Sequence, residues 1–93
     1  RARRGVDQTN IKMIANAVQM YQLLENKDPA IGEPFDWSQL RGYGIETEPE
    51  SPWTDSEYTI TKSEDEDGKS LVISNSSTNH EEEDDILIPS LSE

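Results

Sequence analysis

The sequence predicts an α+β domain in which a long N-terminal helix packs on a small antiparallel β-sheet. Three observations support this fold class: a helical pattern of apolar residues in 6–26, two short strand-like runs in 57–76, and a polar connection between them. A chain of 93 residues is long enough for one domain. We therefore expect a single domain that spans residues 1–93.

The expected helix covers residues 1–28, and its apolar side chains span more of its circumference than one sheet can cover. Two apolar stripes lie side by side and together span roughly 220° of arc, whereas a surface helix usually needs an apolar arc of only about 100°. We therefore expect a second covering surface. The first stripe contains Ile11, Ile14, Ala15, Val18 and Tyr21, and the second contains Met13, Ala17, Met20 and Leu24.

Residues 29–56 are expected to form the loop that connects the helix to the sheet. Pro29 ends the helix, because the residue before a proline is pushed out of the helical region and the proline cannot continue the hydrogen-bond ladder. Asp36 is placed to cap one helical turn that starts at Trp37 or Ser38. We interpret the apolar and aromatic side chains of this segment as contacts that fasten the loop to the helix, in preference to a ligand pocket. They are Phe35, Trp37, Leu40 and Tyr43.

Residues 57–76 are expected to form a β-hairpin. Apolar and polar residues alternate in 57–62, and 70–74 is a second run rich in β-branched residues. The charged segment between them contains Asp67-Gly68, a dipeptide that favours a tight turn. Two strands around such a turn pair in the antiparallel sense.

Residues 77–93 are expected to form an acidic loop and a C-terminal segment. The polar tract 75–85 has a composition that cannot bury enough apolar surface to order itself. Beyond it, residues 86–89 either return as a short edge strand that Pro89 closes, or form a tail that becomes ordered only on contact with a partner.

The charge balance excludes one class of partner. The chain has 20 acidic and 8 basic residues and a net charge of -12, which repels nucleic-acid phosphates. We expect no nucleic acid to bind the domain. A basic cluster of Arg1, Arg3 and Arg4 lies at the start of the helix, where it either approaches anionic headgroups or is an ordinary exposed helix end.

The sequence offers little for catalysis or metal binding, and we do not expect an enzyme. The single histidine, His80, lies in the polar tract without a nucleophile or a second histidine nearby. We interpret it as a solvated loop histidine rather than a catalytic base or a metal ligand. The absence of cysteine excludes disulfides and thiolate metal sites.

We expect no cofactor, and a calcium site at the hairpin tip or at residues 81–85 is the minor alternative. Ser63, Asp65 and Asp67 before Gly68 are typical of the first half of a calcium-binding loop. The second half is absent, since Ser74 stands where a bidentate glutamate is needed. A charged hairpin tip is therefore the preferred interpretation, with Asp65 and Asp67 as the candidate calcium ligands if one binds.

The order of these parts resembles the soluble domain of type IV pilin-like proteins, the family of type IV pilins and type II secretion pseudopilins. Residues 16–29 (NAVQMYQLLENKDP) look like the end of the family's long helix. Residues 36–43 (DWSQLRGY) look like the loop that follows, and residues 49–60 (PESPWTDSEYTI) are similar to the Pro-Trp turn that leads into the first strand. The resemblance covers residues 1–62.

The sequence also departs from the family pattern. Ser51 and Thr54 replace the aspartate and glycine expected around Pro52-Trp53. The glycine-rich, aspartate-bearing segment that supports calcium binding in major pseudopilins is not recognisable after Ser74, and the cysteine pair of many type IV pilins is absent. These departures argue against carrying over the family's calcium site.

The resemblance implies a structural subunit. Members of this family are made with a short leader and a hydrophobic helical half that anchors them in the inner membrane, and they polymerise into a helical fibre after leader cleavage. It implies such a half upstream of Arg1, and an extracytoplasmic location in a periplasmic or cell-surface fibre. The implied partners are copies of the chain, other pilin-like subunits and an inner-membrane assembly platform, which serves a pilus, a secretion system or DNA uptake.

The resemblance also gives the two helix stripes separate roles. Ile11, Ile14, Val18 and Tyr21 would cover the hairpin, while Met13, Ala17, Met20 and Leu24 would face neighbouring subunits, although the two roles can be exchanged between the stripes. The alternative function is a small acidic extracytoplasmic module that binds a basic protein partner. Such a module would use residues 81–93 or the aromatic loop.

Overall fold

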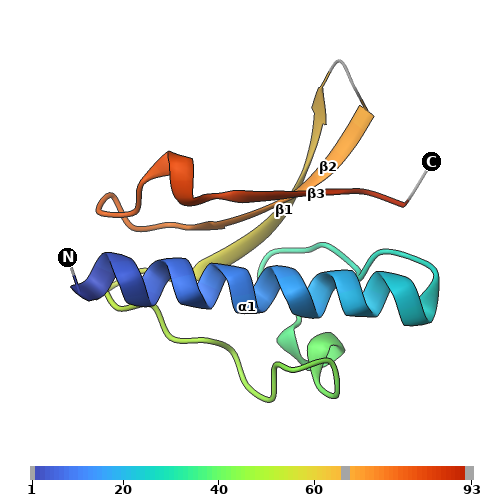
Figure 1. Cartoon of the computed structure of the whole chain (residues 1–93), viewed down its shortest axis with the longest axis horizontal. Helices are drawn as coiled ribbons and strands as arrows, with labels where there is room; N and C mark the ends of the chain where they lie inside the picture. The colour runs from blue at the N-terminus through green and yellow to red at the C-terminus, as the bar shows by residue number, and fades with distance from the viewer. Residues whose placement is uncertain (1, 66–67, 92–93) are drawn as a thin grey trace.

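The computed structural model describes residues 2–65 and 68–91, which form one α-helix and a three-stranded antiparallel sheet (Figure 1). This confirms the predicted α+β class. The helix α1 spans Ala2–Glu25, and the strands are β1 (Tyr58–Asp65), β2 (Gly68–Asn75) and β3 (Ile86–Pro89). Two short 3₁₀ turns, η1 (Trp37–Leu40) and η2 (Glu82–Asp84), lie in the connections.

The helix ends three residues before the predicted boundary at residue 28. Asn26 takes a left-handed conformation with φ of 59°, and its N–H donates to the Gln22 carbonyl at 2.8 Å. Asparagine is one of the few residues that adopt this conformation readily at the end of a helix. Asn26, and not Pro29, therefore terminates α1.

The sheet has the order β1-β2-β3, so β2 is central. The predicted hairpin is confirmed by the register of β1 and β2, which runs from Tyr58 opposite Asn75 to Asp65 opposite Gly68. Residues 86–89 form an edge strand with Leu71 opposite Ile88. Of the two alternatives for this segment, the edge strand is therefore correct.

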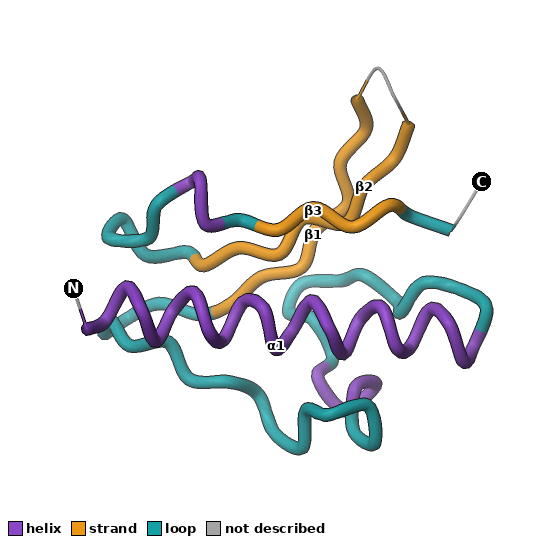
Figure 2. The backbone as a smooth tube through the Cα atoms, in the orientation of Figure 1, coloured by secondary structure: helices purple, strands orange, loops and turns teal. Residues whose placement is uncertain are grey.

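The connection between α1 and β1 leaves the end of the helix on the sheet side, crosses the helix, and from η1 onward runs along the side that faces away from the sheet (Figures 1 and 2). Asp36 caps η1 by accepting a hydrogen bond from the Ser38 N–H at 3.1 Å, as predicted. The ring of Tyr43 lies 5.3 Å from the ring of Tyr21, and the Tyr43 hydroxyl donates to the Glu25 carboxylate. The interpretation that the aromatics fasten the loop to the helix is therefore correct for Tyr43, whereas Phe35 and Trp37 pair with each other and line a pocket with β1.

The core has three layers, because both the sheet and the connection contribute buried side chains. The connection is therefore part of the second covering surface that the wide apolar arc of α1 requires. The buried apolar residues are Ile11, Ile14, Ala15, Ala17 and Val18 of α1, Phe35, Leu40 and Ile45 of the connection, and Tyr58, Ile60, Leu71, Ile73 and Ile88 of the sheet.

Candidate functional site

Helix α1 keeps an exposed apolar face after the sheet and the connection have packed on it. Val6, Met13 and Met20 are 48%, 39% and 47% exposed and follow one another at intervals of seven residues. Residues seven apart are about two turns apart and share one side of a helix. Leu24, four residues after Met20, extends the row and is 66% exposed. We call these four residues the apolar face.

Three of the four residues that we expected to face neighbouring subunits lie on this face: Met13, Met20 and Leu24. Ala17 does not, because it is 2% exposed and belongs to the core. It lies at the edge of its stripe, next to the covered side of α1, where its small side chain is enclosed by the domain. Val6 was overlooked in the sequence, although its seven-residue spacing from Met13 was a usable signal.

The four residues that we expected to cover the hairpin divide in a similar way. Ile11, Ile14 and Val18 are fully buried in the core. Tyr21 is half-buried, and its ring pairs with Tyr43 of the connection. The first stripe therefore serves two surfaces, since part of it packs on the loop.

An acidic edge runs beside the apolar face. An open groove of about 580 Å³ has Met13 on one wall and residues 44–50 of the connection on the other. Glu46, Glu48 and Glu50 of this segment are exposed. Asn10 of α1 donates to the Glu50 carbonyl at 3.2 Å and holds the segment beside the helix.

His80 is a buried side chain, which contradicts its interpretation as a solvated loop histidine. Its side chain is 4% exposed, and each ring nitrogen lies 2.6 Å from a carboxylate oxygen, Nδ1 from Asp7 and Nε2 from Asp85. Asp7 is completely buried because it lies one helical turn before Ile11, on the core side of α1. A carboxylate at that position needs a partner, and this was the signal in the sequence that could have identified His80.

The two carboxylates determine the charge of His80. Burial alone would lower the pKa of His80, but the hydrogen bonds to Asp85 and Asp7 and their negative charges outweigh it, so the pKa lies above its usual value. An ionised carboxylate only accepts hydrogen bonds, so two ionised partners need a proton on each ring nitrogen. The two contacts and the raised pKa therefore favour an imidazolium at His80.

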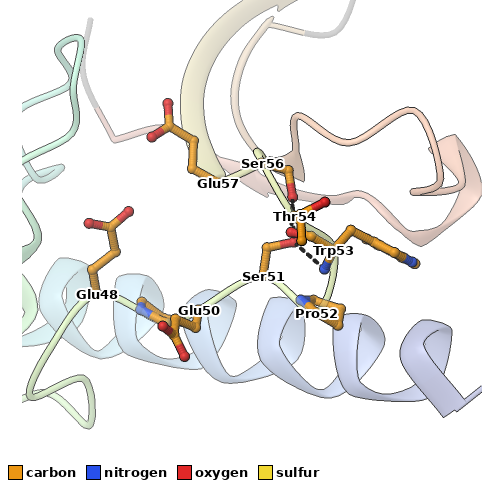
Figure 3. Close-up of a pocket in the computed structure, with 9 residues that line it drawn as sticks. Glu48, Glu50, Ser51, Pro52, Trp53, Thr54, Ser56 and Glu57 are labelled. Carbon is orange, nitrogen blue, oxygen red and sulfur yellow. Dashed lines mark hydrogen bonds between the residues drawn. The ribbon is translucent and has the colours of Figure 1, made fainter.

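A hydrogen-bond network continues from Asp7 to the Pro-Trp turn. The Asn75 amide donates to Asp7 at 3.1 Å and to the Ser51 hydroxyl at 3.0 Å. The hydroxyls of Ser51 and Ser56 lie 2.6 Å apart, and Ser56 donates to the Trp53 carbonyl at 2.8 Å (Figure 3). The start of α1, the end of β2 and the Pro-Trp turn thus share one network.

Tyr58 lies at the border of this network. Its hydroxyl accepts a hydrogen bond from Asn10 at 3.2 Å. Burial, with a smaller contribution from a hydrogen bond to Asp7, raises the pKa of Tyr58 to about 12. The phenol therefore stays neutral beside the buried carboxylate at physiological pH.

The basic cluster at the start of α1 is partly paired within the molecule. Arg4 contacts Glu83 at 2.8 Å and Asp84 at 2.9 Å, and the hydrogen bond from Arg4 lowers the pKa of Asp84. Arg3 is exposed, and Arg1 lies outside the described residues. The expectation that the acidic tract cannot order itself is wrong, because Arg4 and His80 hold it against α1.

The Pro-Trp turn and the described part of the hairpin do not form a recognisable metal site. Asp65 ends β1, and Asp67, the other candidate calcium ligand, lies outside the described residues. An open groove of about 510 Å³ at the Pro-Trp turn carries Glu48, Glu50 and Glu57, whose carboxylates do not converge on one point (Figure 3). Within residues 2–65 and 68–91, no three histidine or acidic side chains gather in a group that could hold a metal ion.

No helix in residues 2–65 and 68–91 is both long enough and apolar enough to cross a bilayer. No family model matches this chain, and no curated protein or solved structure matches it either.

Proposed function

We propose that this chain is a structural subunit of a type IV pilus-like fibre, either a type IV pilin or a type II secretion pseudopilin, and that it polymerises through α1. The observation that carries the proposal is the apolar face of Val6, Met13, Met20 and Leu24. This row stays uncovered although the sheet and the connection both pack on α1.

The energetics of this face favour association. Full burial of an apolar side chain contributes about 1.5 to 3 kcal/mol, so a row of four is a substantial driving force for packing against a neighbour. The seven-residue interval is the one at which helices pack along a common seam. Two of the four residues are methionines, whose flexible side chains adapt to the changing contacts of a helical assembly.

The proposal includes a location and a set of partners. A hydrophobic segment upstream of Arg1 anchors the subunit in the inner membrane before assembly, and the subunit then enters an extracytoplasmic fibre. Its partners are copies of itself, other pilin-like subunits and the inner-membrane assembly platform. The proposal assigns the domain no catalytic role.

The contacts of the acidic segment favour this proposal over the small acidic binding module. Asp84 and Asp85 are engaged by Arg4 and His80 within the chain. The aromatic loop is likewise used internally, since Phe35 is buried and Tyr43 packs on Tyr21. Part of each surface that the binding module would use is therefore engaged within the domain itself.

The direct test is to place charges on the apolar face of the protein as it is made in its own cells. Met13→Glu combined with Met20→Glu should abolish the fibre fraction and leave the helical circular dichroism and the melting temperature of the domain close to wild type. Gln19→Glu, on the exposed polar side of the same helix, is the control and should assemble normally. Leu24→Lys provides an independent charged variant.

Wild-type amounts of fibre from both Met13→Glu/Met20→Glu and Leu24→Lys would overturn the proposal. The coding sequence upstream of Arg1 gives a second test. We expect it to encode a leader and an apolar run of about 20 residues, whereas a soluble upstream domain would contradict the fibre.

A further inference from the structure

His80 joins three segments that are distant in the sequence. It belongs to the loop between β2 and η2, and its two ring nitrogens contact Asp7 of α1 and Asp85, the residue directly before β3. The side chain is 4% exposed, so little water can replace either contact. His80 therefore contributes to the position of this loop on α1 and to the entry into β3, beside the contacts of Arg4 and Gln8 with Asp84.

The two contact distances fit a ring that carries a proton on each nitrogen. At 2.6 Å from a carboxylate oxygen, an N–H is a strong charge-assisted donor. If the ring loses one proton, a nitrogen lone pair faces that oxygen at the same distance, and the attraction becomes a repulsion. The neutral ring can keep only one of its two contacts.

The surroundings of His80 contain more carboxylates than cations. Asp7 faces it from α1, Asp85 from the segment before β3, and Asp84 lies next along the chain with Arg4 bound to it. Glu81 follows His80 directly, and the neutral Tyr58 of β1 lies beside Asp7. Loss of the imidazolium charge would leave Asp7 and Asp85 without the cation that both contact.

The network reaches the Pro-Trp turn through the second oxygen of Asp7. Oδ2 of Asp7 contacts His80, and Oδ1 accepts from Asn75, which also donates to Ser51. Ser51 in turn accepts from the Trp53 N–H at 3.2 Å. A displacement of Asp7 therefore changes the support of Trp53.

We propose that His80 is a proton-controlled latch. The doubly protonated ring helps to hold the 77–85 segment on α1 through Asp7 and Asp85. Loss of one proton loosens this segment, which Arg4 and Gln8 still contact through Asp84, and changes the environment of Trp53 while the remaining fold persists. The inference goes beyond the proposed fibre function and does not rest on it. The core around Ile11 and Leu71 does not contain the latch, so the release is local.

The chain is well suited to a direct test, because His80 is its only histidine and its ring-proton NMR signals are unambiguous. The variant Trp37→Phe leaves Trp53 as the only tryptophan, so that its fluorescence reports on the Pro-Trp turn. With rising pH, the titration of His80, the change of Trp53 emission and the loss of amide protection in 77–85 should share one midpoint above the usual histidine value. Helical circular dichroism should stay constant through this transition.

The variant His80→Gln, made in the Trp37→Phe background, should show low amide protection in 77–85 at every pH and no transition of Trp53. Glu81→Gln, at an exposed neighbour of His80, is the matched control and should keep the transition. The latch is overturned if His80 titrates while Trp53 and the 77–85 amides stay unchanged. It is also overturned if the whole domain unfolds at that midpoint, or if His80→Gln retains the transition.

Discussion

The side chains of Arg4 and Asp84, which are 80 positions apart in the sequence, form a contact between the first turn of α1 and the acidic tract, with Arg4 Nε 2.9 Å from Asp84 Oδ2. Arg4 also reaches Glu83, and Gln8 donates to Asp84 at 3.0 Å. The segment that we expected to be disordered is thus held by polar contacts and not by apolar burial. Contacts of this kind respond to salt and pH, and this makes the arrangement testable.

Replacement of Arg4 should lower stability in a salt-dependent way. We expect Arg4→Ala to lower the urea midpoint of unfolding at low ionic strength, and the difference from wild type to shrink as salt screens the interaction. The effect should be modest, because the Arg4 side chain is 41% exposed. Arg3→Ala is the matched control, and an equal loss in both variants would show that the contact contributes nothing specific.

Stability should fall as the pH rises through the titration of His80. The folded state raises the pKa of His80, so its contribution is complete below the usual value of about 6.5 and is lost as the pH rises through the folded-state value. Urea unfolding of wild type and His80→Gln at a series of pH values measures this. The difference in the free energy of unfolding between wild type and His80→Gln should be largest at low pH and should shrink as the pH rises. A difference that stays constant with pH would contradict the charged imidazolium.

The connection should contribute to the core as strongly as the sheet does. Leu40 of η1 is completely buried, and Leu40→Ala should lower the free energy of unfolding by about 2 to 5 kcal/mol through lost burial and the cavity left behind. Leu23→Ala removes the same atoms from a side chain that is 80% exposed. This variant should change the free energy of unfolding by less than about 0.5 kcal/mol. Similar values for the two variants in urea unfolding would show that the loop does not pack on α1 as described.

The end of α1 should tolerate glycine better than alanine. Asn26 has a φ of 59°, a conformation that costs most residues with a β-carbon roughly 1 kcal/mol, while glycine adopts it freely. We expect Asn26→Ala to lower the melting temperature and Asn26→Gly to leave it near wild type. A melting temperature for Asn26→Ala equal to that of Asn26→Gly would mean that the helix does not end at this residue.

The elements with clear periodic patterns were predictable from the sequence. The helix, the capped turn at Asp36 and the hairpin follow local rules of spacing and capping, and the structure contains all three. The helix end was misplaced, because Pro29 is a stronger sequence signal than the left-handed Asn26 that terminates α1.

The relationships that depend on the tertiary fold were not predictable in the same way. The composition of residues 75–85 indicates disorder, yet His80 and Asp84 find partners in α1, more than 70 positions away. The burial of Ala17 depends on how the domain encloses α1, which no helical pattern reveals. Asp7 on the buried side of the helix was the one local indication that a polar partner had to exist.

The most direct test of the proposed assembly is photo-cross-linking from the apolar face. A photoreactive phenylalanine analogue at position 20 should capture a second copy of the chain, or another pilin-like subunit, in the protein as it is made in its own cells. The same analogue at position 19, on the exposed polar side of α1, is the control. We expect a cross-linked species from position 20 and little from position 19, whereas no product from position 20, or equal yields from both, would contradict a helix-to-helix assembly through this face.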